Sequence, residues 1–140
     1  MKSTFQKILI SAILERLNLD DNIVKTASWT SETLTGTGTV TAEVTKWEQA
    51  APNMPAWIAF VSVLGMTFHS EDPDKYIIQT MHENCLQCCA DFTPDSFVGT
   101  LPEGSTVAGI LPVKHSEIRE NEDQFMFTVD FGLAIVNTPF

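Results

Sequence analysis

Near the N-terminus, apolar residues recur at the spacing of a helix. The stripe consists of Phe5, Ile8, Leu9, Ala12, Ile13 and Leu17, and it is widened by Ile10 and Leu14. This pattern predicts a helix that begins near Ser3, with apolar side chains over more than half of its circumference. A surface helix of a monomer usually has a narrower stripe. We therefore expect a sheet to cover one side of this helix and a neighbouring subunit to cover the other, with Ile10 and Leu14 at the subunit contact.

Four later segments have the patterns of strands. Residues 40–45 alternate between apolar and polar, which predicts a half-buried strand. The run WIAFVSVLGMTF (57–68) is apolar on both faces, so we expect a central strand. Residues 106–118 contain Pro112, which places the third strand at an edge or at a bulge. In the fourth strand, alternate positions form one apolar face, which consists of Phe125, Phe127, Val129, Phe131, Leu133 and Ile135.

A second helix and a long polar segment lie between these elements. Asp72 followed by Pro73 predicts the start of a helix that continues to about Asp91. Residues 19–39 are rich in Thr, Ser and Asp, and we expect them to form a loop or an arm. The element order is then helix, strand, strand, helix, strand, strand. This order predicts a single α+β domain over residues 1–140, with a mainly antiparallel sheet and two helices packed on it.

Composition narrows the class of protein. The chain has 140 residues, of which 44% are hydrophobic and 19% are charged, as is typical of a soluble globular domain. No apolar run approaches the ~20 residues that a membrane-spanning helix needs. The short apolar stretch near the N-terminus is not followed by a small-x-small cleavage site, so we do not expect a signal peptide. Three cysteines, an odd number, and the absence of an Asn-x-Ser/Thr sequon favour an intracellular setting.

The charge argues against binding to nucleic acid or to membranes. The formal net charge is −10, and the eight basic residues are scattered singly along the chain. Proteins that bind nucleic acid or anionic membranes use clustered Lys and Arg to neutralise phosphates. We expect this acidic surface to keep the protein soluble and to repel nucleic acid.

The stretch MHENCLQCCADF (81–92) concentrates residue types that bind metals or act as nucleophiles. Helical spacing places five side chains on one face of the predicted second helix, namely Ile77, Met81, Cys85, Cys88 and Phe92. Free cysteine packs as a small hydrophobe. We therefore expect Cys85 and Cys88 to lie in the core, with Cys89 and His82 at the flank of the same face.

The chain lacks the other patterns of common active sites. A structural zinc site needs a second ligand cluster, yet His69 and His115 stand alone in the sequence. In GTLPEGS, Ser105 occupies the position of the P-loop lysine, and GTGTVT lacks the third glycine of a dinucleotide fingerprint. Neither a G-x-S-x-G elbow nor a calcium loop is present. We assign no catalytic, cofactor-binding or metal-binding residue, and we expect that the protein is not an enzyme.

Four parts of the chain carry its strongest patterns. They are FQKILISAILERL, WIAFVSVLGMTF, YIIQTMHENCLQCC and the final pair, VAGILPVKHSEI with QFMFTVDFGLAIVN. In order and size these elements resemble the tail-terminator and tail-completion proteins of long-tailed bacteriophages. The resemblance covers nearly the whole chain, but only as element order, because the family has no motif that can be compared residue by residue.

The resemblance implies a structural protein of the virion, assembled in the host cytoplasm, that forms a ring, typically of six subunits. Such a ring caps the finished tail tube and joins it to the head connector. The implied partners are further copies of the chain, a tail-tube protein and a neck protein. DNA would only pass through the lumen, which the acidic charge suits. We place Ile10, Leu14, Trp29 and Trp47 at the expected subunit interface.

Two alternatives remain open. One is a small α+β ligand-binding or hydrolytic domain, which predicts a defined pocket between the helices and the sheet. The other is a different neck component, such as a head-closure or adaptor protein. The sequence does not distinguish such a component from a tail terminator.

Overall fold

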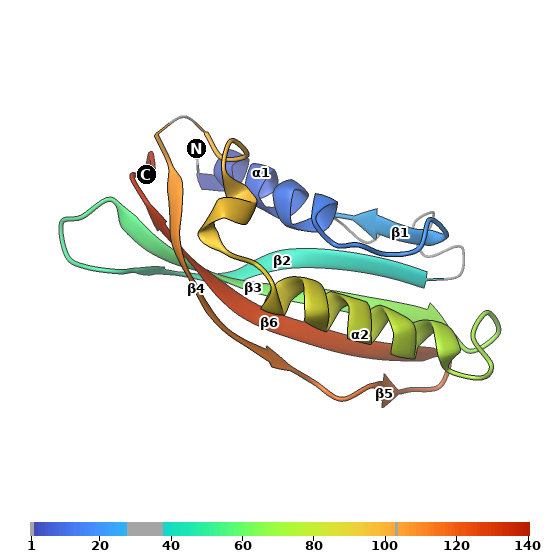
Figure 1. The fold of residues 1–140 in the computed structure, drawn as a ribbon. Helices are drawn as coiled ribbons and strands as arrows, with labels where there is room; N and C mark the ends of the chain where they lie inside the picture. The colour runs from blue at the N-terminus through green and yellow to red at the C-terminus, as the bar shows by residue number, and fades with distance from the viewer. Residues whose placement is uncertain (1, 28–37, 103) are drawn as a thin grey trace.

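A computed structural model describes residues 2–27, 38–102 and 104–140 of the chain. Its elements in chain order are α1 (Lys2–Glu15), β1 (Ile23–Thr26), β2 (Gly38–Gln49), β3 (Ala56–Phe68), α2 (Tyr76–Ala90), η1 (Pro94–Phe97), β4 (Thr106–His115), β5 (Arg119–Glu120) and β6 (Gln124–Val136). The predicted α+β fold is confirmed, because the described residues form two α-helices and a mostly antiparallel sheet of six strands. Both α-helices lie on the same side of this sheet (Figure 1).

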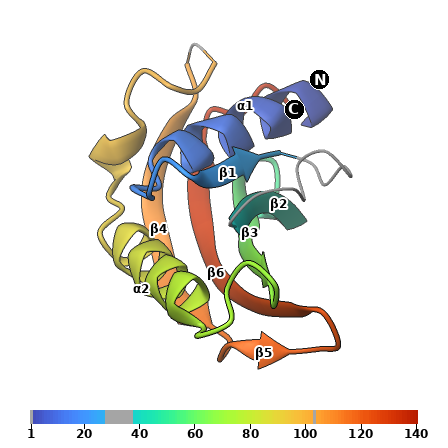
Figure 2. The same ribbon diagram turned by 90° about the vertical axis from the view of Figure 1, so that its right-hand side faces the viewer.

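The sheet is built around a long antiparallel ladder between β3 and β6. The strand order is β1-β2-β3-β6-β4, and β5 pairs with the first residues of β6 (Figure 2). The prediction of a central strand at 57–68 is confirmed, since β3 pairs with β2 on one side and with β6 on the other. β4 is an edge strand whose register shifts between Leu111 and Lys114, around Pro112, as the proline predicted.

Two strands of the sheet were not predicted, the four-residue β1 and the two-residue β5. β1 pairs in parallel with the start of β2, so that Ile23 lies beside Gly38 and Thr26 lies beside Thr41. The expectation of a loop over 19–39 is therefore wrong for β1. Its pattern is weak because Ile23 alone among its four residues is buried. Residues 28–37, which include Trp29, lie outside the described part of the chain.

The sheet buries one face beneath α1 and α2. All six apolar residues predicted for one face of the last strand are buried there. On the same face of β3, Val61 and Val63 are also buried. At Gly65 the backbone approaches Phe127 so closely that an added Cβ would lie 2.1 Å from the ring. The glycine thus makes room for a large ring beneath α2, whose His82 lies 4.8 Å from that ring between centres.

The first helix is covered by its own chain. Ile10 is 5% exposed and Leu14 is 6% exposed, and both belong to the hydrophobic core. The expectation that these two residues form a free surface for a neighbouring subunit is therefore wrong. The sheet covers one side of α1, and the η1 region lies against a second side, which carries Arg16. On that second side, Arg16 donates a hydrogen bond to the Ser96 carbonyl and lies 5.4 Å from the ring centre of Phe97.

The start of the second helix depends on Asp72, although α2 begins only at Tyr76. The Asp72 side chain is buried, and its two oxygens accept hydrogen bonds from the backbone N–H groups of Ile77 and Ile78, each at 2.9 Å. The Thr67 hydroxyl of β3 donates to the same carboxylate at 3.0 Å. Asp72 therefore provides acceptors for unpaired N–H groups in the first turn of α2, and it links that turn to β3.

Replacing Asp72 with alanine should lower the free energy of unfolding by about 2–3 kcal/mol, because two helix N–H groups and a buried hydroxyl lose their acceptor. Urea denaturation followed by circular dichroism measures this change. Asp74→Ala, at an exposed position in the same turn, is the matched control. Equal midpoints for the two variants would show that the carboxylate does not stabilise the helix start.

Candidate functional site

The cysteines of α2 face the core. Cys85 and Cys89 are fully buried, whereas Cys88 is half-buried. The expected core face is therefore wrong at one cysteine, since Cys89 takes the place predicted for Cys88. The buried positions 78, 81, 85 and 89 and the predicted face both satisfy helical spacing. They differ by a small rotation of the helix, which is set by packing on the sheet rather than by the spacing.

Burial makes these thiols poor nucleophiles and poor metal ligands. Desolvation raises the pKa of Cys85 to about 12, and the neighbouring Cys88 thiol adds to the rise. Desolvation likewise raises the pKa of Cys89, with further contributions from Cys85 and Cys88. Because the thiolate is the reactive form and the metal-binding form, the core position disfavours both chemistries. At Cys88, the backbone N–H of Asn18 donates to the sulfur at 3.3 Å.

Two histidines that are distant in the sequence meet in the fold. The ring centres of His82, on α2, and His115, at the end of β4, are 5.3 Å apart, so His115 does not stand alone as expected. The Nε2 atom of His82 is buried and has no hydrogen-bond partner among the described residues. Burial lowers the pKa of His82, and His115 lowers it further, against opposing contributions from the Ser116 backbone and Glu83. The site therefore favours the neutral imidazole.

The described ranges offer little for metal or membrane binding. Within them, no three His, Cys, Asp or Glu side chains gather closely enough to hold a metal ion. None of their helices combines the length and the apolar character needed to cross a membrane. The third histidine, His69, lies 3.5 Å from Glu120, which is equally close to Lys75. Glu120 of β5 thus lies between the side chains of His69 and Lys75.

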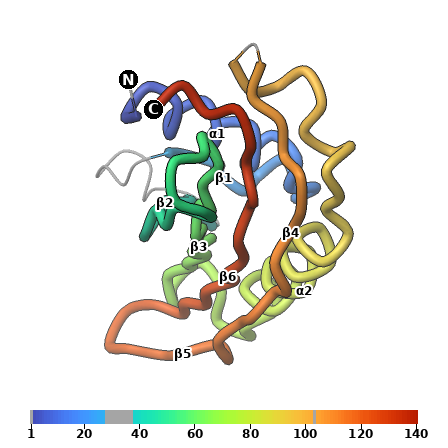
Figure 3. The backbone as a smooth tube through the Cα atoms, turned by 90° about the vertical axis from the view of Figure 1, so that its left-hand side faces the viewer, coloured from blue at the N-terminus to red at the C-terminus, as the bar shows by residue number. Residues whose placement is uncertain are grey.

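Trp47, which we expected at a subunit interface, makes contacts within its own chain. Its ring centre lies 6.1 Å from that of Phe5 and 5.0 Å from that of Phe140. Its Nε1–H donates to the Gln6 side chain at 3.1 Å. The residue therefore joins α1 to the C-terminal end of the chain, and Figure 3 shows the two termini side by side.

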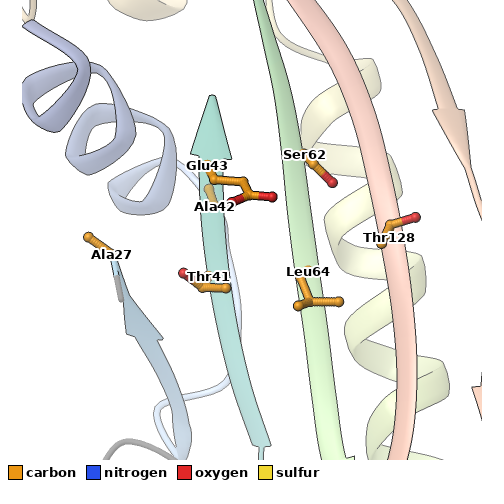
Figure 4. Close-up of a pocket in the computed structure, with 7 residues that line it drawn as sticks. All are labelled: Ala27, Thr41, Ala42, Glu43, Ser62, Leu64 and Thr128. Atoms are coloured by element: carbon orange, nitrogen blue, oxygen red, sulfur yellow. The ribbon is translucent and has the colours of Figure 1, made fainter. Parts of the chain in front are cut away.

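The face of the sheet opposite α1 and α2, which we call the open face, carries three adjoining hollows. The first has a volume of about 730 Å³, crosses β2, β3, β6 and β4, and is lined by Thr45, Lys46, Phe60, Val61, Ser62, Leu111, Pro112, Lys114, Asp130, Phe131 and Gly132. The second, of about 300 Å³, adjoins it at Ser62 and is drawn in Figure 4. The third, of about 230 Å³, adjoins the second at Leu64 and Thr128. Together they form one continuous, shallow surface.

The open face combines half-buried apolar side chains with exposed charges. Phe60 and Leu64 of β3 are half-buried, whereas Glu43, Lys114 and Asp130 are exposed. In Figure 4, Glu43 and Leu64 lie on the near side of the sheet with α2 behind it. Half-buried apolar side chains on a broad surface are typical of contacts between proteins.

A pocket of the kind expected for a ligand-binding or hydrolytic domain would lie between helices and sheet. Where α2 meets β1, the structure has a hollow of about 120 Å³ near Ile23, Tyr76 and Met81. Sites for small molecules usually have volumes of roughly 300–1,000 Å³. The volume of this hollow is thus below that range, and the largest of the hollows described above lies on the opposite face of the sheet.

No protein-family model matches the chain, and no curated protein matches it in sequence. The interpretation of the site therefore rests on its geometry and on the order of its elements.

The open face was not identified from the sequence. The run 57–68 is apolar at both sets of alternate positions, which predicted equal cover on both faces of β3. A signal was present in β6, where Thr128, Asp130 and Gly132 alternate with buried apolar residues. Polar and small residues at those positions indicate a face without a helix on it.

Cys88 should react with a bulky maleimide before Cys85 and Cys89, which should remain unmodified until denaturant opens the fold. The physical reason is that Cys88 alone is accessible, while burial excludes the reagent and suppresses the thiolate of the other two. Mass spectrometry of digested protein at successive times measures the order, and Cys88→Ser should remove the fast phase. Modification of Cys89 at the rate of Cys88 would instead support the orientation of α2 that the sequence spacing suggested.

Acidification should destabilise the fold through His82. Its folded-state pKa lies below the unfolded value of 6.5, so the unfolded chain binds more protons as the pH falls through that value. The free energy of unfolding therefore has its full value above pH 6.5 and decreases progressively as the pH falls below it. Urea denaturation of wild type and His82→Leu on both sides of this pH measures the effect, and the variant should show a smaller loss of stability on acidification. Equal losses in the two proteins would contradict this role of His82.

Proposed function

We propose that the chain is a structural subunit of a ring at the head–tail junction of a long-tailed phage, where it caps the tail tube and joins it to the head connector. The observation that carries this proposal is the open face. It is a broad, shallow surface with half-buried apolar side chains, which fits a neighbouring protein better than an enclosed small substrate.

Two features of the sequence support the same proposal. The order and size of the elements resemble those of tail-terminator and tail-completion proteins. The net charge of −10 would let DNA pass through a lumen without binding to its wall. The partners are then further copies of the chain, a tail-tube protein and a neck protein, and the location is the virion.

The proposed contact surface differs from the one inferred from the first helix. Ile10 and Leu14 are buried within the chain, and Trp47 is partly buried against α1. The residues that remain available on the sheet are those of the open face, among them Phe60 and Leu64. We therefore place the contact with the tail tube or with a neighbouring subunit on the open face.

Incubation of the purified protein with phage tail tubes should give particles with a ring of this protein at one end of the tube. Negative-stain electron microscopy would show the ring, and native mass spectrometry would count its subunits, for which we expect six. Leu64→Glu should prevent binding to the tube because it places a charge in an apolar contact, whereas Lys7→Glu, on the exposed side of α1, should not. Bare tubes with the wild-type protein would refute the proposal.

A further inference from the structure

The register of the sheet places charged residues of the open face in a single row. Glu43 of β2 lies beside Ser62 of β3, Ser62 lies beside Asp130 of β6, and Asp130 lies beside Lys114 of β4. Residues paired in this way project from the same face of a sheet. The row therefore runs across four strands from a negative end at Glu43 to a positive end at Lys114.

The charges of this row are complementary to those of the same row in a second copy that runs in the opposite direction. A twofold axis parallel to the strands, passing between Ser62 and Asp130, would place a second open face over the first with the row reversed. Glu43 of each copy would then face Lys114 of the other. Each Asp130 would face a Ser62 hydroxyl, which can donate to the carboxylate. All six charged side chains of the two rows would gain a partner.

The apolar side chains of the two copies meet under the same reversal. Phe60 of β3 lies beside Gly132 of β6, and Ile58 lies beside Ala134. The Leu111 side chain of β4 lies over Gly132, 3.1 Å from where a Cβ would be. The twofold axis would therefore place Phe60 of one copy against Leu111 of the other, and Ile58 over Ala134. Apolar side chains that meet in this way form the core between two packed sheets.

Electrostatic repulsion opposes association only weakly at this face. The ionisable residues that line the three hollows are the acidic Glu43, Glu120 and Asp130 and the basic Lys46, Lys114 and Arg119. These six charges cancel, and Glu48, which pairs with Lys46 at 3.2 Å on the same face, leaves a net charge of −1 there, against −10 for the chain as a whole. Two copies that meet through the open face would therefore keep the excess negative charge on their outer surfaces.

The area of the face is close to what a stable dimer requires. Four strands at ~4.8 Å spacing and about nine residues at ~3.3 Å give a flat footprint of roughly 600 Å². The accessible area is larger than the flat footprint because side chains project from the sheet. A standard interface buries about 800 Å² on each partner.

From the charge row, the apolar contacts, the low net charge of the face and its area, we propose that the open face is a self-association surface. Its occupant in the free protein is a second copy of this chain, packed face to face about a twofold axis. Such a contact closes on itself and cannot continue around a ring. The proposal therefore goes beyond the ring function and does not depend on it. If both hold, the dimer opens before the subunit joins a ring.

Sedimentation equilibrium tests the dimer and its geometry. The wild-type protein should be a dimer at micromolar concentration. Glu43→Lys and Lys114→Glu should each raise the dissociation constant by about tenfold or more, since each places like charges opposite each other twice. The double variant with both changes should restore binding to near the wild-type value, because the exchanged pair is again complementary. Phe60→Glu should also weaken the dimer.

The controls separate local charge pairing from overall charge. Asp95→Lys and Lys7→Glu make the same changes in net charge at exposed positions away from the open face, and they should leave the dissociation constant unchanged. Circular dichroism confirms that each variant is folded. The proposal would be overturned if the wild-type protein were a monomer, or if it formed a larger assembly that the charge swaps leave intact. It would also be overturned if the double variant bound no more tightly than either single variant, or if the open face bound only a different protein.

Discussion

The structure depends on the uninterrupted ladder between β3 and β6, which pairs Ala56 with Val136 at one end and Phe68 with Gln124 at the other. Because side chains alternate along both strands, this ladder has two faces that need different cover. One face presents the aromatic and aliphatic residues of β6, and α1 and α2 bury it. Gly65 allows Phe127 to pack flat against the backbone of the neighbouring strand. The other face keeps its half-buried phenylalanine and leucine residues without a helix above them among the described residues.

The same constraint decides what the reactive side chains can do. α2 must place its apolar line on the sheet, so Cys85 and Cys89 enter the core and their pKa values rise. His82 follows them to the core boundary, where it meets His115 and loses basicity. Asp72 is buried for a related reason, because its carboxylate accepts hydrogen bonds from the first N–H groups of α2, where the helix turns back over β3. The side chains that suggested chemistry in the sequence are therefore used mainly for packing and for backbone hydrogen bonds.

The fold class, the central strand and the edge position of the strand with Pro112 could be predicted because each follows from local periodicity or from proline geometry. Three features could not be predicted for reasons that are also physical. β1 has a single buried residue and pairs in parallel, so it leaves almost no pattern. The rotation of α2 that exchanges Cys88 for Cys89 is smaller than helical spacing can resolve. The width of the apolar stripe on α1 does not reveal whether the chain itself or another subunit covers Ile10 and Leu14.

The charge pattern of the open face could not be predicted from the sequence, because it depends on the register between the strands. Glu43, Ser62, Asp130 and Lys114 come from four strands, and only the paired sheet brings them into one row. Each residue alone is an ordinary surface position. Their order across the sheet gives the face a direction of charge, and its half-buried apolar residues give a reason for a protein to cover it.

The distance between spin labels at position 62 in two copies tests most directly whether the open face is the contact surface. A nitroxide would be attached to Ser62→Cys in a Cys88→Ser background, and dipolar electron spin resonance would be recorded at a concentration where the protein associates. Sheets packed at ~10 Å predict an inter-spin distance of about 20 Å or less. A label at Asp95→Cys, on the helix side, should be much farther from its counterpart. A short distance at position 95 with none at position 62 would contradict a contact through the open face.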